Sequence, residues 1–600
     1  MSALHRPPRG SRTWSGRPRG AAGAPAATRH GSPSTPTRRM APGVGPLLRS
    51  LEGAPFVRYR EILGSHAAGE FTIRVDQVPA DPFAESARIC LIGGRAAAGL
   101  LPEAVRDRHA RVGVEDWFAR RAVAACAQLG SARPGQTHVR VQEIGSAIVE
   151  RSACRLGSDT IELRLLVDLP VASGRIRGTE CERLFVEDLP RIATRTLLCS
   201  SDAARKAREA AQVAADHGML QRQIVERGLV AFLPDGAWLD EGSTTVRATP
   251  QRLEAPASLA THLEREQGGS VRGLAIPAGV TLIVGGAFQG KSALVDALVA
   301  AVHPHPPGHA WAGIASHPDA VPIRAEPGRF VQGLDLTAFL DDPPWGMRAA
   351  CYSTDCASAV VSQAAAVAEA LEVGARVLLI DEDRSAPRWL ARDGVMQRLV
   401  PRPQDSITPF LERARELYED HGVSSVVATG AIGDFVQVAD TVLSVEDGRL
   451  NDVTLQARDL AAATRSFRVR ESGRAMRLPA PRIPEVAPDA DLARLHVGAR
   501  GRSLRVGSQT ISLDMLDPVT EPGQPRTLAR WLEEVARRIA EGGTVRDLAF
   551  SFDEWIEREG LDALAPPAAY DLTRPRRFEL AAVLGRWRAL RFRPCPGDGT

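Results

Sequence analysis

The sequence has no long hydrophobic run, no paired cysteine motif and almost no lysine. Its longest apolar runs, such as Val377–Ile380, are far shorter than the roughly 18 to 20 residues that cross a bilayer, so we expect no membrane-spanning helix. The eight cysteines are scattered without a CxxC pair, which argues against a zinc site and a disulfide framework. A chain of 600 residues that is 44% apolar and 24% charged is instead typical of a soluble protein with several cores, and the expected compartment is the reducing cytoplasm.

Acidic residues are absent from the first 51 positions, which contain nine arginines. Because these nine positive charges exceed the net charge of +3, the remaining chain is mildly acidic. Proline, glycine, serine and arginine dominate residues 1–50, and such a composition cannot bury enough apolar surface to offset its conformational entropy. We predict a disordered tail over residues 1–50. A transit peptide and a translation start at Met40 are alternatives that the sequence leaves open.

Apolar periodicity divides the rest of the chain into four parts. Residues 51–228 alternate strand-like runs with helical stretches, which predicts an α+β accessory domain that ends in a linker helix. Residues 229–460 are dense in short apolar strands and turns, as in an α/β domain. Residues 461–490 are rich in arginine and predict a basic linker, and residues 491–600 predict a largely helical C-terminal extension.

A β-branched run, Val280–Val284, leads into Gly285-Gly-Ala-Phe-Gln-Gly-Lys-Ser and then into a helix-like segment. This spacing behind a strand predicts a P-loop, in which backbone N–H groups and a helix N-terminus bind phosphate. Lys291 is expected to bridge the β- and γ-phosphates of ATP, and Ser292 to bind Mg²⁺. Lysine occupies only two of the 75 basic positions, and one of them is here, where a compact ammonium is needed. The predicted ATP-binding residues of the loop are Gly285, Gly286, Ala287, Phe288, Gln289, Gly290, Lys291, Ser292 and Ala293.

A second motif is the aliphatic run Val377–Ile380 followed by two acids. It predicts a buried strand that ends at Asp381, which would hold Mg²⁺ together with Ser292. Glu382, one residue farther on, is then placed to act as the general base that polarises water. The alternative is that both acids cap a strand or a helix.

Other P-loop classes fit less well. GTPases read guanine with an Asn-Lys-x-Asp motif, and the one asparagine, Asn451, is followed directly by Asp452, which excludes that class. A small-molecule kinase needs an arginine-rich lid, and residues 383–392 could supply one. The glutamate beside Asp381 nevertheless favours hydrolysis.

A small polar turn, Ser353–Gln363, lies between the two motifs and precedes a helical stretch. In ABC-type ATPases a turn at this point in the order is the signature loop, which binds the γ-phosphate held by the other subunit through a helix N-terminus. We expect Ser358 and Gln363 to contact ATP in this way. The alternative is an ordinary helix N-cap at Ser358 or Ser362.

Over residues 55–592 the chain resembles the single-chain ABC-class ATPases, a family distinct from the ABC transporters. The segments that carry this resemblance include Gly228-Leu-Val-Ala-Phe-Leu-Pro-Asp-Gly, Tyr352-Ser-Thr-Asp-Cys-Ala-Ser, Leu379-Ile-Asp-Glu-Asp-Arg-Ser-Ala and Asp571-Leu-Thr-Arg-Pro-Arg-Arg-Phe-Glu. The resemblance implies an α/β fold with a P-loop, ABC-like ATPase core between an N-terminal α+β accessory domain and a mainly helical C-terminal extension. It also implies that ATP is sandwiched between two cores facing head to tail in a homodimer.

The chain departs from the pattern of this family at several positions. The family signature Ala-Ser-Gly-Ser-Thr-Ser-Gln is replaced by residues 357–363, in which Ala359 removes the glycine and Val360 and Val361 remove two hydroxyls. In the P-loop, Ala287 replaces a glycine and Gln289 a histidine. We expect ATP binding to survive these changes and turnover to be less efficient.

Two functions remain open from the sequence. The first is a cytoplasmic Mg-ATPase that uses dimer closure as a conformational switch. The second is an ATP-dependent RNA-binding protein with weak or no hydrolysis, whose basic surface would combine the arginines of 465–482, 500–505 and 574–593 with Phe578, Trp587 and Phe592. Arginine-rich segments are also often solvated faces. His303, His305 and His309 could bind a metal, although the prolines among them favour a loop without one.

Overall fold

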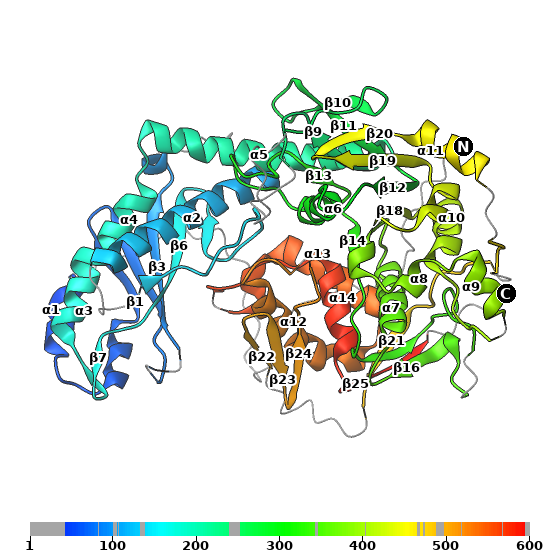
Figure 1. Cartoon of the computed structure of the whole chain (residues 1–600). Helices are drawn as coiled ribbons and strands as arrows, with labels where there is room; N and C mark the ends of the chain where they lie inside the picture. The colour runs from blue at the N-terminus through cyan, green and yellow to red at the C-terminus, as the bar shows by residue number, and fades with distance from the viewer. Residues whose placement is uncertain are drawn as a thin grey trace, which may run out of the picture.

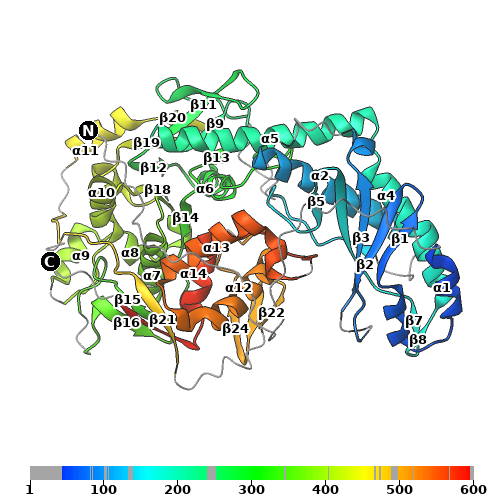
Figure 2. The same ribbon diagram turned by 180° about the vertical axis from the view of Figure 1, so that it is seen from behind.

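The computed structural model describes residues 43–594, except 82, 84, 100–104, 106, 133–138, 239–251, 343–345, 403, 465–467, 472–474, 488–496, 518 and 567. The N-terminal domain lies at one end of the molecule, and the long helix α5 (Ser201–Glu226) connects it to the central domain (Figures 1 and 2). The C-terminal extension lies against the central domain, below α5 in Figure 1. Among the described residues, no helix combines the length and the apolar character needed to cross a membrane.

The N-terminal domain is an antiparallel sheet covered by helices. Its strands run in the order β1-β2-β3-β6-β4, and β5 pairs with β6 as well. The core of this domain is a hydrophobic cluster of its own, to which the sheet and the helices both contribute. The strands are β1 (Gly64–Ala68), β2 (Phe71–Gln77), β3 (Ala87–Gly94), β4 (Val139–Arg140), β5 (Cys154–Leu156) and β6 (Thr160–Val167), with a small ribbon of β7 (Val171–Ala172) and β8 (Arg175–Ile176). The helices are α1 (Val44–Ser50), α2 (Arg108–Ala132), α3 (Gly178–Arg183) and α4 (Leu189–Leu197).

Helix α1 corrects one prediction from the sequence. The disordered tail was predicted to extend to residue 50, and its residues 1–42 lie outside the described part of the chain. Residues 44–50, however, form α1, which buries Val44 and Leu48 in the N-terminal domain. Val44 and Leu48 lie four residues apart on one face of this helix, and that face packs against the domain core.

The central domain contains a six-stranded sheet with the order β14-β17-β18-β12-β19-β20. All neighbours are parallel except β19 and β20, which form a hairpin. The inner strands β17 and β18 are buried along their whole length because both faces of a parallel sheet are covered. The strands are β12 (Val280–Val284), β14 (Ala320–Ile323), β17 (Val377–Asp381), β18 (Ser424–Thr429), β19 (Thr441–Glu446) and β20 (Arg449–Asp452). The helices are α6 (Lys291–Ala300), α7 (Ala359–Glu372), α8 (Pro387–Leu390), α9 (Gly394–Leu399), α10 (Phe410–His421) and α11 (Thr454–Ala463).

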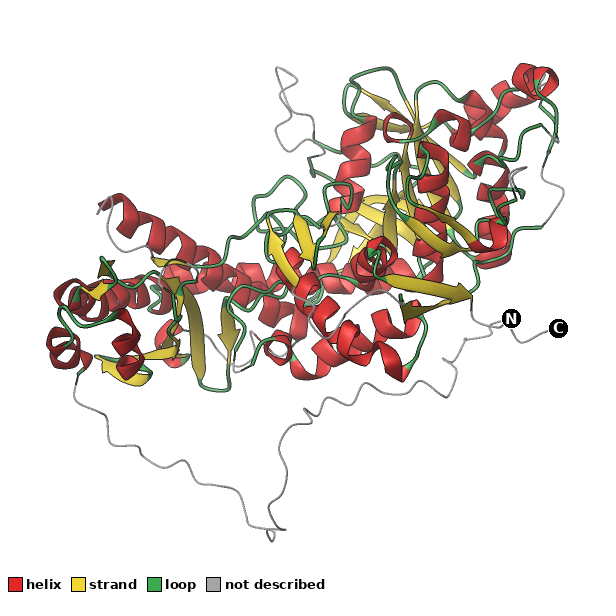
Figure 3. Ribbon diagram, turned by 90° about the horizontal axis from the view of Figure 1, so that it is seen from below, coloured by secondary structure: helices red, strands yellow, loops and turns green. Residues whose placement is uncertain are grey.

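Two smaller sheets flank this sheet. An antiparallel sheet with the order β10-β11-β9-β13 lies beside α5 and α6, and β15 pairs with β16 next to α7. Their strands are β9 (Leu229–Pro234), β10 (Ala260–Glu264), β11 (Ser270–Pro277), β13 (Ala315–Ser316), β15 (Val331–Leu334) and β16 (Tyr352–Thr354). In Figure 3 the sheets of the N-terminal domain and of the central domain lie at opposite ends of the molecule.

The C-terminal extension shares a hydrophobic core with the central domain. Trp531, Phe552 and Trp587 belong to the same buried cluster as Leu378 and Leu417. The extension has three helices, α12 (Gln524–Arg538), α13 (Val545–Glu559) and α14 (Arg577–Arg586), as its apolar periodicity predicted. It also has a three-stranded antiparallel sheet, β22 (Val497–Arg500), β23 (Ser503–Val506) and β24 (Gln509–Ser512), which was not predicted.

The predicted basic linker is in part a strand. β21 (Arg482–Val486) pairs with the last strand, β25 (Leu590–Pro594), in antiparallel register. Arg482 is buried in this ribbon, so it is not part of an exposed basic arm. The fold class predicted from the sequence, an α/β P-loop core with flanking domains, is confirmed.

Candidate functional site

The glycine-rich loop between β12 and α6 needs glycine at two positions. Gly285 has φ 157°, and a Cβ there would lie 2.5 Å from the carbonyl oxygen of Val445. Gly290 has φ 110° and forms the N-cap of α6. Both values lie in a region that L side chains rarely adopt, so the bend of the loop depends on these glycines. Ser292 and Ala293 follow in the first turn of α6. The nine predicted residues therefore form one continuous segment that runs from the loop into the start of this helix.

Lys291 folds back over this loop. Its Nζ donates hydrogen bonds of 2.8 Å to the carbonyl oxygens of Gly285 and Gly286. On the other side of the loop, the backbone N–H of Asp447 donates to Oε1 of Gln289 at 2.5 Å. Gln289 thus ties the loop to the turn between β19 and β20. Phe288, with φ 62°, leaves its ring 86% exposed.

Asp381 is the last residue of β17, next to the P-loop edge of the sheet. Its carboxylate is buried, and Oδ1 accepts the N–H of Asp383 at 3.2 Å. Oδ2 is buried and accepts no hydrogen bond from any described residue. Arg384 lies 3.8 Å from this oxygen, and its guanidinium grips Asp296 of α6, which raises the pKa of Arg384. A buried carboxylate oxygen without a donor suits Mg²⁺, which prefers oxygen ligands.

Glu382 is fixed through one of its two oxygens. Oε2 accepts hydrogen bonds from the Thr429 hydroxyl at 2.6 Å, the Gly430 N–H at 2.8 Å and the Ala431 N–H at 3.2 Å. Thr429 ends β18, and Gly430 and Ala431 follow it; β18 lies between β17 and β12 in the sheet. A side chain at residue 430 would come within 3.4 Å of Lys291 Nζ. The P-loop, the two acids and residues 429–431 therefore meet at the carboxyl edge of the parallel strands, where ligands bind in open α/β sheets.

Residues 429–431 were not singled out from the sequence. The strand-like run Ser424–Thr429 ends in a glycine-containing turn, which is a weak signal by itself. This turn matters because β18 lies between the strand that ends at Asp381 and the strand that precedes the P-loop. Only the order of strands in the sheet shows this.

The predicted signature segment caps a 14-residue helix, α7. Ser358 is the N-cap, and its exposed side chain accepts the N–H of Val361 at 3.3 Å. Ser362 is buried; it accepts the N–H of Glu326 and donates to the carbonyl of Ala359. Ser358 is thus the one of these two serines that faces outward.

Gln363 corrects the predicted contact with ATP. Its side chain is fully buried, donates to the Ser385 hydroxyl at 2.8 Å and accepts the N–H of Ala386 at 2.8 Å. Both ends of the amide are therefore engaged inside the domain. Gln363 links α7 to the segment that follows Glu382, a positioning role that the local pattern did not predict.

A buried network of ion pairs surrounds the middle and end of α7. Glu369 pairs with Arg329 at 2.9 Å, and Glu372 pairs with Arg482 of β21 at 2.8 Å. Arg586 of α14 pairs with Glu326 and lies 3.8 Å from Glu369. Burial acts to raise the pKa of Glu369, but the three arginines around it lower that pKa overall. Strand β21 and the C-terminal extension therefore each supply one of the charges that hold α7.

The basic surface proposed for RNA is corrected by the burial of its aromatic residues. Phe578, Trp587 and Phe592 are 5%, 1% and 7% exposed, so they cannot stack on bases in this conformation. Several of the arginines form ion pairs with acids of the chain: Arg468 with Glu412, Arg470 with Glu416, Arg574 with Glu150 and Asp553, Arg577 with Asp319 and Arg588 with Asp355.

The histidine cluster was a metal-site alternative. His305 stacks on His309, with ring centroids 4.6 Å apart, and meets the edge of Trp311. Within the described ranges, no group of three or more His, Cys, Asp or Glu side chains is arranged to hold a metal ion.

Comparisons with known families match three consecutive parts of the chain. Residues 45–200 are similar to the family described as the N-terminal part of ATPases of the ABC class. Residues 203–481 match an ABC ATPase family described as a P-loop domain. Residues 496–593 match the MRB1590 C-terminal domain. A search of curated proteins gave no match.

Proposed function

Because the chain belongs to the ABC class of P-loop ATPases, we propose that it binds and hydrolyses Mg-ATP at the site formed by the P-loop, Asp381 and Glu382. The observation that carries this proposal is the meeting of Lys291, Asp381, Glu382 and residues 429–431 at one edge of the parallel sheet. Lys291 would exchange the two carbonyl oxygens for phosphate oxygens. A hydrogen bond from Lys291 to a charged phosphate oxygen is stronger than one to a neutral carbonyl oxygen.

The residues present fit Mg²⁺. The hydroxyl of Ser292 and Oδ2 of Asp381 would hold the ion, which supplies neutralisation of charge on the phosphates when it is bound. The supporting feature is that Oδ2 of Asp381 is buried without a donor.

Glu382 is suited to act as the general base. Three donors hold Oε2, and no described residue donates to Oε1. One oxygen therefore orients the carboxylate while the other is left to take a proton from the attacking water. The hydroxyl of Thr429 and the N–H groups of Gly430 and Ala431 are positioning groups in this scheme.

We further propose that two chains close head to tail over ATP and that this closure works as a conformational switch. The exposed hydroxyl of Ser358 at the N-terminus of α7 would meet the γ-phosphate bound by the other subunit, where the positive end of the helix dipole favours an anion. The RNA-binding alternative is not taken further, because its three aromatic residues are buried and several of its arginines are paired within the chain.

Two variants and one control test the assignment. Lys291→Ala should lose ATP affinity, whereas Lys206→Ala, which removes the only other lysine from an exposed position on α5, should not. Glu382→Gln should keep ATP binding, lower the hydrolysis rate by about 10²- to 10⁴-fold, and accumulate an ATP-bound dimer. Calorimetry, phosphate release and size-exclusion chromatography with Mg-ATP measure these effects. Equal ATP affinity in both lysine variants would refute the P-loop assignment, and an unchanged rate in Glu382→Gln would refute the base.

A further inference from the structure

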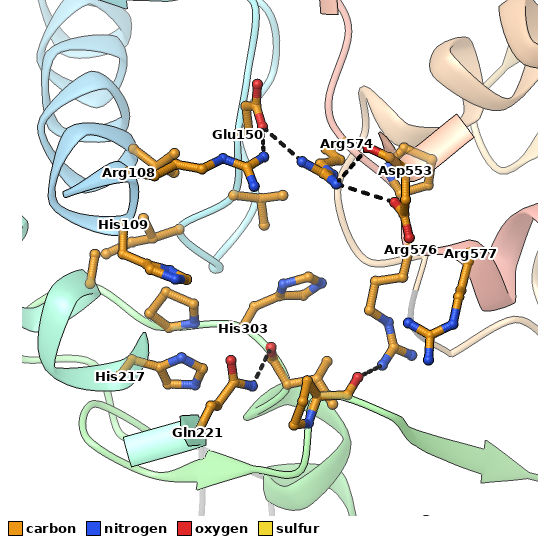
Figure 4. A pocket seen from close by; sticks show the side chains of 18 of the residues that line it. Arg108, His109, Glu150, His217, Gln221, His303, Asp553, Arg574, Arg576 and Arg577 are labelled. Carbon is orange, nitrogen blue, oxygen red and sulfur yellow. Dashed lines mark hydrogen bonds and ion pairs between the residues drawn. The ribbon is translucent and has the colours of Figure 1, made fainter. Parts of the chain in front are cut away.

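A second pocket lies where the three domains meet, away from the P-loop (Figure 4). Its volume is about 300 Å³, and its walls come from α2, residues 148–150, α5, the segment after α6 and residues 574–578. The proposed ATPase function uses none of these residues. The volume lies at the lower end of the roughly 300 to 1,000 Å³ typical of small-molecule sites.

The walls of this junction pocket are held together by hydrogen bonds across the domains. The backbone N–H of Ile148 donates to the Pro304 carbonyl at 2.7 Å, and Gln221 of α5 donates to the Val302 carbonyl at 3.2 Å. Arg576 donates to the Pro318 carbonyl at 3.2 Å. The pocket is therefore formed before any ligand binds, which lowers the entropy lost on binding.

One part of the pocket is apolar and another is basic. Val112, Val149, Val302 and Phe578 contribute the apolar part. Four arginines line the pocket together with three acids: Arg108, Arg574, Arg576 and Arg577 with Glu150, Asp319 and Asp553. Burial raises the pKa of Asp553 to about 7, so this carboxyl carries less than a full negative charge near neutral pH. Each arginine also has an acidic partner: Arg108 pairs with Glu150 and Glu557, Arg574 with Glu150, Asp553 and Glu557, Arg576 with Glu579, and Arg577 with Asp319.

His303 lies at the centre of this arrangement. Figure 4 shows its ring between His217 and Arg576, directed toward the side where the arginines gather. Its Nε2 is buried and has no hydrogen-bond partner among the described residues. Burial, and after it the positive charge of Arg576, lowers the pKa of His303 well below its usual value. A buried imidazole nitrogen without a partner is an unfilled hydrogen-bonding position, and the positive charge of Arg576 close to it favours an anionic group there.

Arg577 supplies a further donor. Its Nε donates to the Val373 carbonyl at 3.0 Å and Nη2 to Asp319 at 2.6 Å, while Nη1 donates to no described residue. The guanidiniums of Arg576 and Arg577 lie side by side in Figure 4. Arginine presents its donors in a fixed fork that matches phosphate oxygens.

We propose that the junction pocket binds a small phosphorylated organic molecule, with its phosphate against His303 and Arg577 and its carbon skeleton against the apolar part. The ligand would contact the N-terminal domain, the segment after the P-loop helix and the C-terminal extension together. It would therefore hold the three domains in the arrangement shown here. The site is separate from the P-loop and does not depend on ATP hydrolysis.

The test uses the full chain with Lys291→Ala, so that phosphate at the P-loop does not contribute. Uridine monophosphate is the probe, and inorganic phosphate and uncharged uridine are its comparisons. Uridine monophosphate should raise the Tm by several degrees at saturation, and uridine should not. His303→Leu in the same background should weaken the apparent affinity about tenfold or more, since a charge-assisted hydrogen bond is lost. His262→Leu, which alters an exposed histidine on β10, is the matched control and should leave the affinity unchanged.

Each outcome decides the proposal. A similar Tm rise with inorganic phosphate supports the site and identifies free phosphate as its ligand, whereas a larger rise with the ester identifies a phosphate ester. No rise with either, or the same affinity in His303→Leu, would overturn it. If His303→Leu does not fold, modification of the Lys291→Ala protein with diethyl pyrocarbonate replaces it. Uridine monophosphate should then slow the labelling of His303 but not of His262, and equal slowing or none would overturn the proposal.

Discussion

Charged side chains are held in two different ways at the P-loop edge of the sheet and around α7. At the sheet edge, Lys291 rests on two backbone carbonyls and Glu382 on two backbone N–H groups and a hydroxyl. Around α7, Glu369 and Glu372 are instead matched by the opposite charges of arginines from distant parts of the chain. The first arrangement satisfies each charge with neutral dipoles, and the second neutralises it.

This difference separates the two regions by role. A charged side chain that is held by neutral hydrogen-bonding groups can move to contact a ligand, and it then loses a few hydrogen bonds of about 1 kcal/mol each. A buried charge that loses its partner is left uncompensated, at a cost of about 3 to 5 kcal/mol. We therefore expect the sheet edge to rearrange during function and the network around α7 to stay fixed.

The largest expected effect comes from breaking the fixed network. Glu372→Gln removes the carboxylate that Arg482 contacts directly and leaves it only Glu369, 4.0 Å away, so the free energy of unfolding should fall by about 3 kcal/mol. Glu382→Gln is the same chemical change at the sheet edge and should lower the free energy of unfolding by about 1 kcal/mol. Denaturant titrations of both variants measure the two losses. Equal losses would mean that the two regions do not differ as described.

A second prediction sharpens the comparison at the N-terminus of α7, where the network meets the signature segment. Ala359→Gly together with Val360→Ser restores close backbone approach and adds a hydroxyl donor beside Ser358. Hydrolysis should rise about tenfold to a hundredfold, since one charge-assisted hydrogen bond gained in the transition state is worth roughly 1.5 to 3 kcal/mol. Steady-state phosphate release measures the rate. An unchanged rate without a pre-steady-state burst would refute the signature interpretation of residues 357–363.

A third prediction concerns Glu115, a buried carboxylate in the N-terminal domain that has fewer hydrogen-bond donors than Glu382. Glu115 accepts one N–H, from Leu156 at 2.9 Å, and burial raises its pKa to about 7. The folded state therefore keeps a proton that the unfolded state has already released, and stability falls as the pH rises from about 4.5 to 7. Glu115→Gln should raise the free energy of unfolding by about 3 kcal/mol at pH 8 and leave it nearly unchanged at pH 4.5. Urea unfolding at both pH values, with Glu61→Gln on the surface as control, tests this; the same shift at both pH values would contradict it.

The smallest expected effect concerns the loop itself. Phe288 has φ 62°, a left-handed conformation that costs a bulky residue about 1 to 2 kcal/mol. Phe288→Gly removes this strain but adds about 0.5 to 1 kcal/mol of unfolded-state entropy, so we expect a net gain of about 0.5 kcal/mol. Thermal unfolding without nucleotide measures the change. A loss of stability would show that the exposed ring is held by contacts stronger than the strain.

Local patterns carried the predictions at the sheet edge. The P-loop is one continuous turn, and Asp381 and Glu382 are consecutive, so their chemistry could be inferred from spacing within a few residues. The fold class followed from the alternation of strands and helices and from the resemblance. The site assignment itself stays a prediction until the variants are measured.

The network around α7 could not be predicted in this way. Arg482 lies 110 residues from Glu372 and was interpreted as part of a basic linker, because nothing near it in the sequence indicates burial. The aromatics of the extension were interpreted as stacking residues because arginines stand between them. Both errors have one cause: an arginine and an aromatic ring serve equally well in a core with paired charges and on a surface that binds nucleic acid. The missing information was which distant carboxylates each arginine meets.

The pairing of β21 with β25 also matters for the order in which the chain can fold during synthesis. Arg586, which pairs with Glu326, leaves the ribosome 260 residues after it, or on the order of tens of seconds later at about 5 to 20 residues per second. Until then, the acids on and around α7 have no basic partners from the extension, and the apolar core that the two regions share stays open. We therefore expect the central domain to complete its hydrophobic core only after β25 has been synthesised. The P-loop sequence leaves the ribosome long before that point.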